Sequence, residues 1–211
     1  MDSYKTLRSG FEATGEFVDR KSRFIAQLAH VENEGEAAAH IAEVRSRHFD
    51  ARHNVPAWIL ADGTERASDD GEPQRTSGMP TLEVLRGAGL RDVCCVTTRY
   101  FGGTLLGPGG LVRAYTAAAQ AAIGEARAAG QLVEMTSVVP MEVHTAYARY
   151  EQVLRLVEQA GGKVTDSAFT DEVMLSLVFH TGDETGFVAA FTELMNGRPQ
   201  LSVGSPRFAE F

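Results

Sequence analysis

The sequence predicts an α+β protein of two domains, with the first over residues 1–135 and the second over residues 136–211. A chain of 211 residues is long enough for one large domain or two small ones. The last third has a complete order of strands and helices of its own, and the segment before it has a separate set. We place the joint at Gln131–Ser137.

The first domain begins with short segments of strand character, two of them joined by a polar turn at 19–22. The expected strands are Tyr4–Arg8, Phe11–Val18 and Arg23–Val31. A helix over Glu34–Arg47 follows, with Ala38, Ile41 and Val44 facing inward. The remaining elements are a strand at Val55–Leu60, a polar stretch from Asp62 to Gly78, a short helix at Thr81–Arg86, a buried strand at Val93–Tyr100 and an alanine-rich helix at Leu111–Arg127. In the last helix, Leu111, Tyr115, Ala118 and Ala122 form one apolar stripe.

The second domain has the clearest pattern of the chain. Its expected elements are a strand at Val138–His144, a helix at Ala146–Ala160, a hairpin of Lys163–Phe169 and Glu172–His180, a helix capped by Asp183 or Thr181, and a strand at Leu201–Ser205. The order strand-helix-strand-strand-helix-strand is that of a ferredoxin-like split unit.

Composition describes an ordinary soluble globule, with 44% hydrophobic and 23% charged residues. No run approaches the length of a membrane span and the N-terminus is no signal peptide, so we expect no membrane association. Cys94 and Cys95 are adjacent in an expected strand, where successive side chains point to opposite faces. A bridge between them is therefore not expected, and two reduced core thiols indicate a cytoplasmic location.

The charge balance excludes a general polyanion binder. The net charge is −8, and it divides into −3 for residues 1–137 and −5 for residues 138–211. Affinity for nucleic acid depends largely on neutralising phosphates, so strong DNA binding is not expected. Any contact with nucleic acid must be a local basic patch.

A glycine-rich segment joins the strand at Val93–Tyr100 to the helix that follows. Its glycines are Gly102, Gly103, Gly107, Gly109 and Gly110, a density that lets backbone amides converge. The helix start carries a positive partial charge, no acid occurs from Gly107 to Gly124, and Arg99 and Arg113 flank the segment. This pattern indicates an anion site, although a purely structural strand-to-helix turn explains the glycines equally well. Phosphate-loop and dinucleotide-binding motifs are absent.

The polar stretch places three carboxylates within four positions, at Asp69, Asp70 and Glu72. Such a cluster can hold magnesium or supply an acid/base pair, whereas the alternative is a solvated loop built on turns. His53 lies at a strand entrance and is interpreted as a surface or capping histidine. The sequence has no His-Glu-x-x-His, Cys-x-x-Cys or Gly-x-Ser-x-Gly motif, so we expect no metal and no cofactor. The weak catalytic candidates are these three acids and His53.

Five short motifs stand out along the first domain. They are Lys21-Ser-Arg-Phe-Ile-Ala, His53-Asn54, Ser68-Asp-Asp-Gly-Glu-Pro73, Arg99-Tyr-Phe-Gly-Gly and Leu106-Gly-x-Gly-Gly-Leu-Val-Arg-Ala-Tyr115. Together they resemble the IMPACT/YigZ family. They fall in one order over about residues 20–116, and the C-terminal pattern is similar to the second domain of the bacterial members. The polar positions that match the family are Arg23, His53, Asp69, Asp70, Glu72, Arg99 and Arg113. Leu105 departs from it, because the family often has a lysine there.

The resemblance implies a first domain with the fold of the second domain of a ribosomal small-subunit protein, as in domain IV of elongation factor G. It implies a second domain similar to domain V of that factor. Eukaryotic relatives regulate translation by competing for the activator of an amino-acid-starvation kinase, and bacterial members have been proposed to bind nucleic acid. No catalytic activity is established for the family.

Three functions remain open from the sequence. The leading one is a non-enzymatic translation-associated protein that contacts RNA, the ribosome or a ribosome-bound factor through the segment 99–113. The second is an enzyme, dependent on magnesium or on acid/base chemistry, that acts on a small phosphorylated or carboxylated ligand. The third is a protein–protein adaptor in which the glycine-rich segment is architectural.

Overall fold

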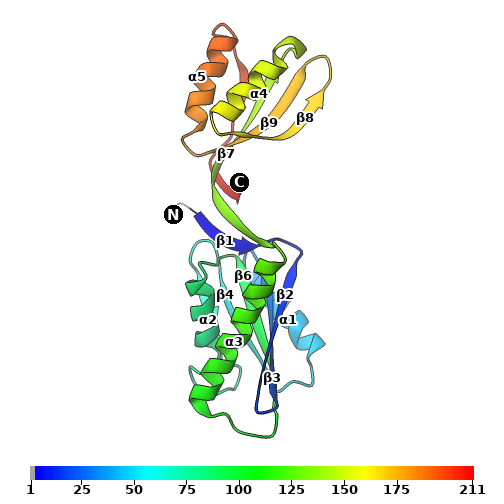
Figure 1. Ribbon diagram of the computed structural model, residues 1–211, viewed down its shortest axis with the longest axis vertical. Coiled ribbons are helices and arrows are strands. Elements are labelled where there is room, and N and C mark those ends of the chain that lie inside the picture. Colours follow the sequence, from blue (N-terminus) through cyan, green and yellow to red (C-terminus); the bar gives the residue numbers. More distant parts are fainter. Residues whose placement is uncertain (1–2) are drawn as a thin grey trace. The chain divides into compact units, whose positions relative to one another are not determined.

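The computed structural model describes residues 3–211, which form two compact units (Figure 1). One unit is Tyr4–Val133 and the other is Glu134–Phe211 together with Ser3. Each combines helices with an antiparallel sheet, as the α+β prediction requires. Among the described helices, none is both long enough and apolar enough to cross a membrane.

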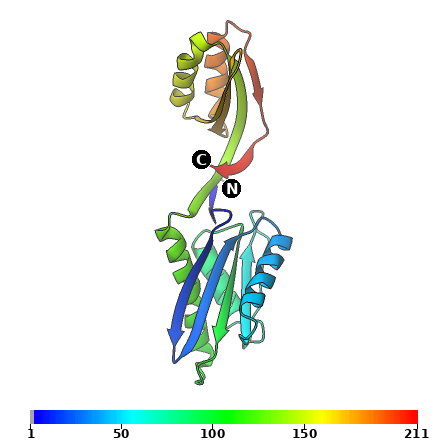
Figure 2. The ribbon, with the colours of Figure 1, turned by 90° about the vertical axis from the view of Figure 1, so that its right-hand side faces the viewer.

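The first unit contains a five-stranded sheet with the order β2-β3-β6-β4-β5. Its strands are β2 (Glu12–Asp19), β3 (Ser22–His30), β4 (His53–Ile59), β5 (Glu65–Ala67) and β6 (Val93–Tyr100), and all neighbours are antiparallel. Helices α2 (Gly78–Gly87) and α3 (Gly107–Ala128) cover one face, and α1 (Glu34–Arg47) covers the other (Figure 2). Strand β1 (Ser3–Leu7) exchanges backbone hydrogen bonds with residues 89–91. β5 was not predicted.

The central strand β6 is buried on both faces, which explains its unbroken apolar run. Cys95 faces the helices α2 and α3, whereas Cys94 packs with Trp58 on the side of α1. Both cysteines are free and buried, as predicted.

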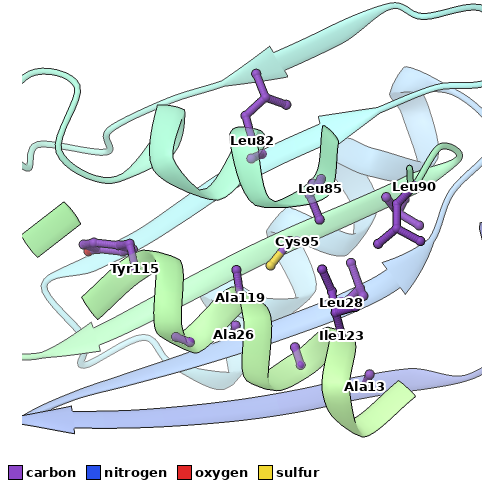
Figure 3. Close-up of a cluster of buried hydrophobic side chains, with 14 of the residues drawn as sticks. Ala13, Ala26, Leu28, Leu82, Leu85, Leu90, Cys95, Tyr115, Ala119 and Ile123 are labelled. Carbon is purple, nitrogen blue, oxygen red and sulfur yellow. The ribbon is translucent and has the colours of Figure 1, made fainter. Parts of the chain in front are cut away.

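Helix α3 packs unusually close to the sheet because its contact stripe is built of small residues (Figure 3). A Cβ atom added to Gly15 in β2 would lie 2.1 Å from the backbone nitrogen of Ala122, so only glycine fits there. The predicted stripe of Leu111, Tyr115, Ala118 and Ala122 is buried. Tyr115 closes one end of this core and contacts Phe24 edge to face, with ring centroids 5.1 Å apart.

Helix α1 begins where the sequence predicts, but its buried face differs by one position at the start. The N-cap Asn33 accepts from the Glu36 amide, and the Glu36 carboxylate accepts from the amide of Glu32, one residue before the cap. Ala37 shares the buried face of His40 and Val44 whereas Ala38 is exposed, so the prediction of Ala38 as inward was wrong.

The second unit has the predicted order of elements and one additional strand. They are β7 (Leu132–Thr145), a short 3₁₀ turn, α4 (Tyr150–Gln159), β8 (Lys163–Phe169), β9 (Val173–His180), α5 (Glu184–Leu194), β10 (Gln200–Val203) and the unpredicted β11 (Arg207–Glu210). The strands run β8-β9-β7, and β10 and β11 both pair with β7. The core contains buried side chains of β7 and β9 and of both helices, including Phe187 and Phe191. β7 begins inside the segment that was predicted as the joint.

Candidate functional site

The turn between β2 and β3 has an unusual backbone. Asp19 pairs with Ser22, so Arg20 and Lys21 alone form the loop of the hairpin. Their φ angles are 46° and 65°, in the left-handed region that such turns require. Asn-Gly is the preferred sequence for this geometry, since a non-glycine residue there costs about 1–2 kcal/mol. The chain therefore holds two cations in a conformation that neither favours.

The glycine-rich segment packs directly on this turn. A Cβ atom on Gly102 would lie 2.1 Å from the carbonyl carbon of Lys21, and the Gly102 amide donates to the Ser22 hydroxyl at 3.1 Å. The Arg20 guanidinium donates to the carbonyl of Leu105 at 3.4 Å. Turn 19–22 and segment 101–113 thus form one surface at the same end of the unit in both views (Figures 1 and 2), and we call it the basic tip.

The basic tip has a net positive charge, because Arg20, Lys21 and Arg113 outnumber Asp19, the one acidic residue of its two segments. Arg20, Lys21 and Arg113 are exposed, and none of the three forms an ion pair with any residue of 3–211. Helix α3 begins at Gly107 with Pro108 in its first turn, it has no acidic residue there, and no side chain caps it. The positive helix start that the sequence indicated is therefore present.

Arg99 belongs to a buried ion pair. Its Nη1 donates to Glu72 Oε1 at 2.7 Å and to Oε2 at 2.9 Å, and the Tyr115 hydroxyl donates to Oε1 at 2.9 Å. Burial and the adjacent Glu72 carboxylate raise the pKa of Tyr115, so its hydroxyl stays protonated and donates. The Arg99 charge is balanced inside the protein, which removes it from the exposed cations of the tip. Arg23 is likewise paired, with Glu16 at 2.7 Å.

His53 lies next to this ion pair. Its Nδ1 is 2.7 Å from the backbone oxygen of Asp70. A carbonyl oxygen only accepts, so Nδ1 carries a proton and donates to it. Nε2 lies 4.0 Å from Glu72 Oε2, beyond hydrogen-bond distance.

The other two carboxylates of the acidic cluster stabilise loop 68–78. Asp69 accepts hydrogen bonds from the amides of Arg75, Ser77 and Gly78, the last at the start of α2. Burial raises the pKa of Asp69, but these hydrogen bonds outweigh it and the net pKa is lowered.

Asp70 accepts from the Asn54 amide at 2.7 Å and from Arg45 at 2.8 Å. Within residues 3–211 no group of three His, Cys, Asp or Glu side chains is placed to hold a metal ion. The three acids are thus divided among separate partners.

A pocket of about 330 Å³ separates the ion pair from the basic tip. Its polar residues are Arg52, His53, Glu72 and Arg99. The rest of the lining is mainly apolar and includes Phe101, Leu105, Leu106, Pro108 and Leu111. The acidic loop and the glycine-rich segment therefore meet at one pocket. Another cavity, of about 760 Å³, lies between α2 and α3 and contains none of the predicted site residues.

Sequence reasoning missed two parts of this site. Tyr115 was assigned to the apolar stripe, and nothing in the helical pattern revealed that its hydroxyl reaches Glu72. The pair Arg20-Lys21 lay in the predicted polar turn, but its two cations were not recognised as part of a site. A two-residue loop between strands that lacks Asn, Asp and Gly was the available signal.

The fold and site define a two-domain α+β protein with an exposed basic loop surface and a small buried polar cluster. The Impact N-terminal domain family matches residues 20–123, and a domain of unknown function, DUF1949, matches residues 143–198. The chain belongs to the IMPACT family.

Relatives of similar length support this assignment. IMPACT family member YvyE of Bacillus subtilis (strain 168) is 32% identical over 100% of this chain and 95% of its own length. IMPACT family member YigZ of Escherichia coli (strain K12) is 35% identical over 86% of this chain and 89% of its own. A solved structure described as a hypothetical protein has a TM-score of 0.60 and 32% identity, covering 95% of this chain and 97% of that one.

Proposed function

We propose that this protein is a non-enzymatic, translation-associated regulator. It binds single-stranded RNA, such as an unpaired segment of ribosomal RNA, through the basic tip. The backbone of the turn carries the proposal. Residues held in strained conformations persist only where the surrounding structure enforces them, and they concentrate at functional sites. Arg20 and Lys21 occupy positions where Asn-Gly would be more stable, so their charges are retained at a cost in stability.

Local charge explains how an acidic protein binds a polyanion. The chain carries a net charge of −8, yet the tip gathers Arg20, Lys21 and Arg113 with the uncapped start of α3. Backbone amides at a helix start and unpaired guanidinium groups are both suited to phosphate. Three such contacts give only a shallow dependence on salt, about −2 in log affinity against log salt for single strands.

Two finer points of the fold belong to this proposal. We assign the second unit to the ferredoxin-like class, because its element order is that of a split βαβ unit. The resemblance to domains IV and V of elongation factor G is consistent with a ribosomal target, and a translation-factor partner would use the same tip. We expect a cytoplasmic location on the same grounds.

The test is cosedimentation with ribosomes at low and moderate salt, together with binding to a labelled single-stranded RNA. Lys21→Ala and Arg113→Ala remove exposed charges and are expected to weaken binding about fivefold each at 0.1 M salt. Arg86→Ala is the matched control, since Arg86 is part-exposed, pairs with Glu65 and Glu83, and belongs neither to the basic tip nor to the pocket beside it. Unchanged binding in both tip variants would remove the tip from the interface.

A further inference from the structure

We propose that the pocket beside the basic tip binds one unpaired nucleobase. The inference rests on the proposed function, because the RNA held at the tip supplies the base. It adds a second mode of contact, in which the backbone lies on the cations and one base enters the protein. Single-stranded RNA is commonly recognised in this way, with splayed bases stacked on side chains and read along their edges.

The walls of the pocket suit a flat apolar ring. Phe101 and Leu105 line it although they are 47% and 81% exposed, so large apolar side chains stand at its mouth. Pro108 and Leu111 continue this surface along the start of α3. A volume of about 330 Å³ falls in the range of small-molecule sites. Nucleobases stack on aromatic side chains regardless of sequence.

The floor of the pocket selects a ring that bears hydrogen-bond donors. Glu72 Oε2 is a carboxylate oxygen that only accepts, and it lies 4.0 Å from His53 Nε2. An N–H or NH₂ group placed beside Glu72 would donate to it and would also lie against the His53 ring. A carboxylate or phosphate at the same place would be repelled by Glu72. The ring nitrogens and exocyclic amines of nucleobases provide such donors.

Arg99 offers the pocket a hydrogen-bond donor that lacks an acceptor. It is 6% exposed and lines the pocket, and its Nε has no hydrogen-bond acceptor among residues 3–211. Only Nη1 is shown bonded to Glu72. Buried guanidinium nitrogens are rarely left without a partner, because the loss of hydration is not repaid. A carbonyl or ring nitrogen of a base is an acceptor of the kind that this group lacks.

Cations around the mouth would hold the rest of the nucleotide. Arg52 lines the pocket, is exposed and forms no ion pair within residues 3–211. Together with Lys21 and Arg113 of the tip it provides phosphate contacts outside the pocket. The base is thus expected to enter from a strand lying across the basic tip.

The experiment compares two labelled oligonucleotides by fluorescence anisotropy, a ten-nucleotide single-stranded RNA and the same backbone without bases. The wild type is expected to bind the complete RNA at least tenfold more tightly. Phe101→Ala is expected to bring the two affinities within twofold, as is His53→Asn, whose amide can still donate to the Asp70 carbonyl while Nε2 is lost. Phe49→Ala is the control, because Phe49 is an aromatic residue that is 85% exposed and does not line the pocket.

The outcomes separate the two proposals. Equal binding of both oligonucleotides by the wild type would overturn the nucleobase pocket and leave RNA binding at the tip intact. If neither oligonucleotide binds, the proposed function fails, and free guanosine and adenosine at millimolar concentration test the pocket alone. A shift of the His53 ring resonances that disappears in Phe101→Ala supports the pocket for a free nucleoside. No shift overturns it.

Discussion

Replacing the turn residues by their preferred types should make the protein more stable and less able to bind RNA. In the variant Arg20→Asn/Lys21→Gly, the backbone at φ 46° and 65° becomes favourable. Relief of the left-handed conformation is worth about 1–2 kcal/mol per residue for glycine and less for asparagine. Glycine also increases the entropy of the unfolded chain, which offsets about 0.5–1 kcal/mol of this gain. We expect the free energy of unfolding to rise by about 1–2 kcal/mol.

Stability can be read from the first unit alone. Trp58 is the one tryptophan of the chain and is 4% exposed in β4, so its fluorescence during urea denaturation reports the unfolding of that unit. RNA affinity is measured in parallel as a function of salt. Each phosphate contact contributes about 0.7 to the slope, which amounts to about fivefold at 0.1 M salt. The loss of two contacts should therefore weaken binding about 25-fold and flatten the slope by about 1.4.

A second variant separates charge from strain. Arg20→Gln/Lys21→Gln removes both cations but keeps the unfavourable backbone, so it should lose the same affinity without gaining stability. If the Asn-Gly variant is stabilised and binds RNA normally, the cations have no role in binding. If it is not stabilised, the argument from backbone strain is refuted.

Three further predictions concern the polar clusters. Arg99→Leu should lower the free energy of unfolding by about 3–5 kcal/mol, because it leaves the Glu72 charge buried without a partner. In urea denaturation, the double variant Arg99→Leu/Glu72→Leu should recover part of that loss. Additive losses would show that Arg99 and Glu72 do not interact. Asp69→Ala should cost about 2–3 kcal/mol through lost hydrogen bonds to loop amides. Because the folded pKa of Asp69 is lowered, this contribution is present above about pH 4 and disappears as the pH falls through the folded pKa, which a pH series of denaturation curves checks. A hydrogen bond to Glu172 and a second one to Glu142 raise the pKa of His144. The contribution of this histidine to stability is therefore present below pH 6.5 and is lost as the pH rises through the folded pKa. An NMR titration should give a pKa above 6.5, and this pKa should fall in Glu172→Gln.

Most helices and strands could be predicted from hydrophobic periodicity and from turn-forming residues. The strands predicted at Val93–Tyr100 and Glu172–His180 agree with β6 and β9 within one residue. β5 and β11 were missed because each is short and polar and becomes a strand only by pairing with β4 or β7. Such pairing is a tertiary property that no local pattern contains.

The sequence by itself determined the α+β class, the free core cysteines, the lack of acidic residues from Gly107 to Gly124 and the need for a local rather than a general basic patch. These follow from near neighbours along the chain. The helix was predicted to begin at Leu111, whereas α3 begins at Gly107. Only the tertiary structure decided which charges are exposed, because Arg99 and Glu72 are 27 positions apart and neutralise each other only after β6 and loop 68–78 have met. Likewise, only the fold places Gly102 against the backbone of Lys21 and Ser22, which joins the turn to the glycine-rich segment. Burial and charge compensation depend on contacts that are distant in sequence, and so they are fixed by the fold.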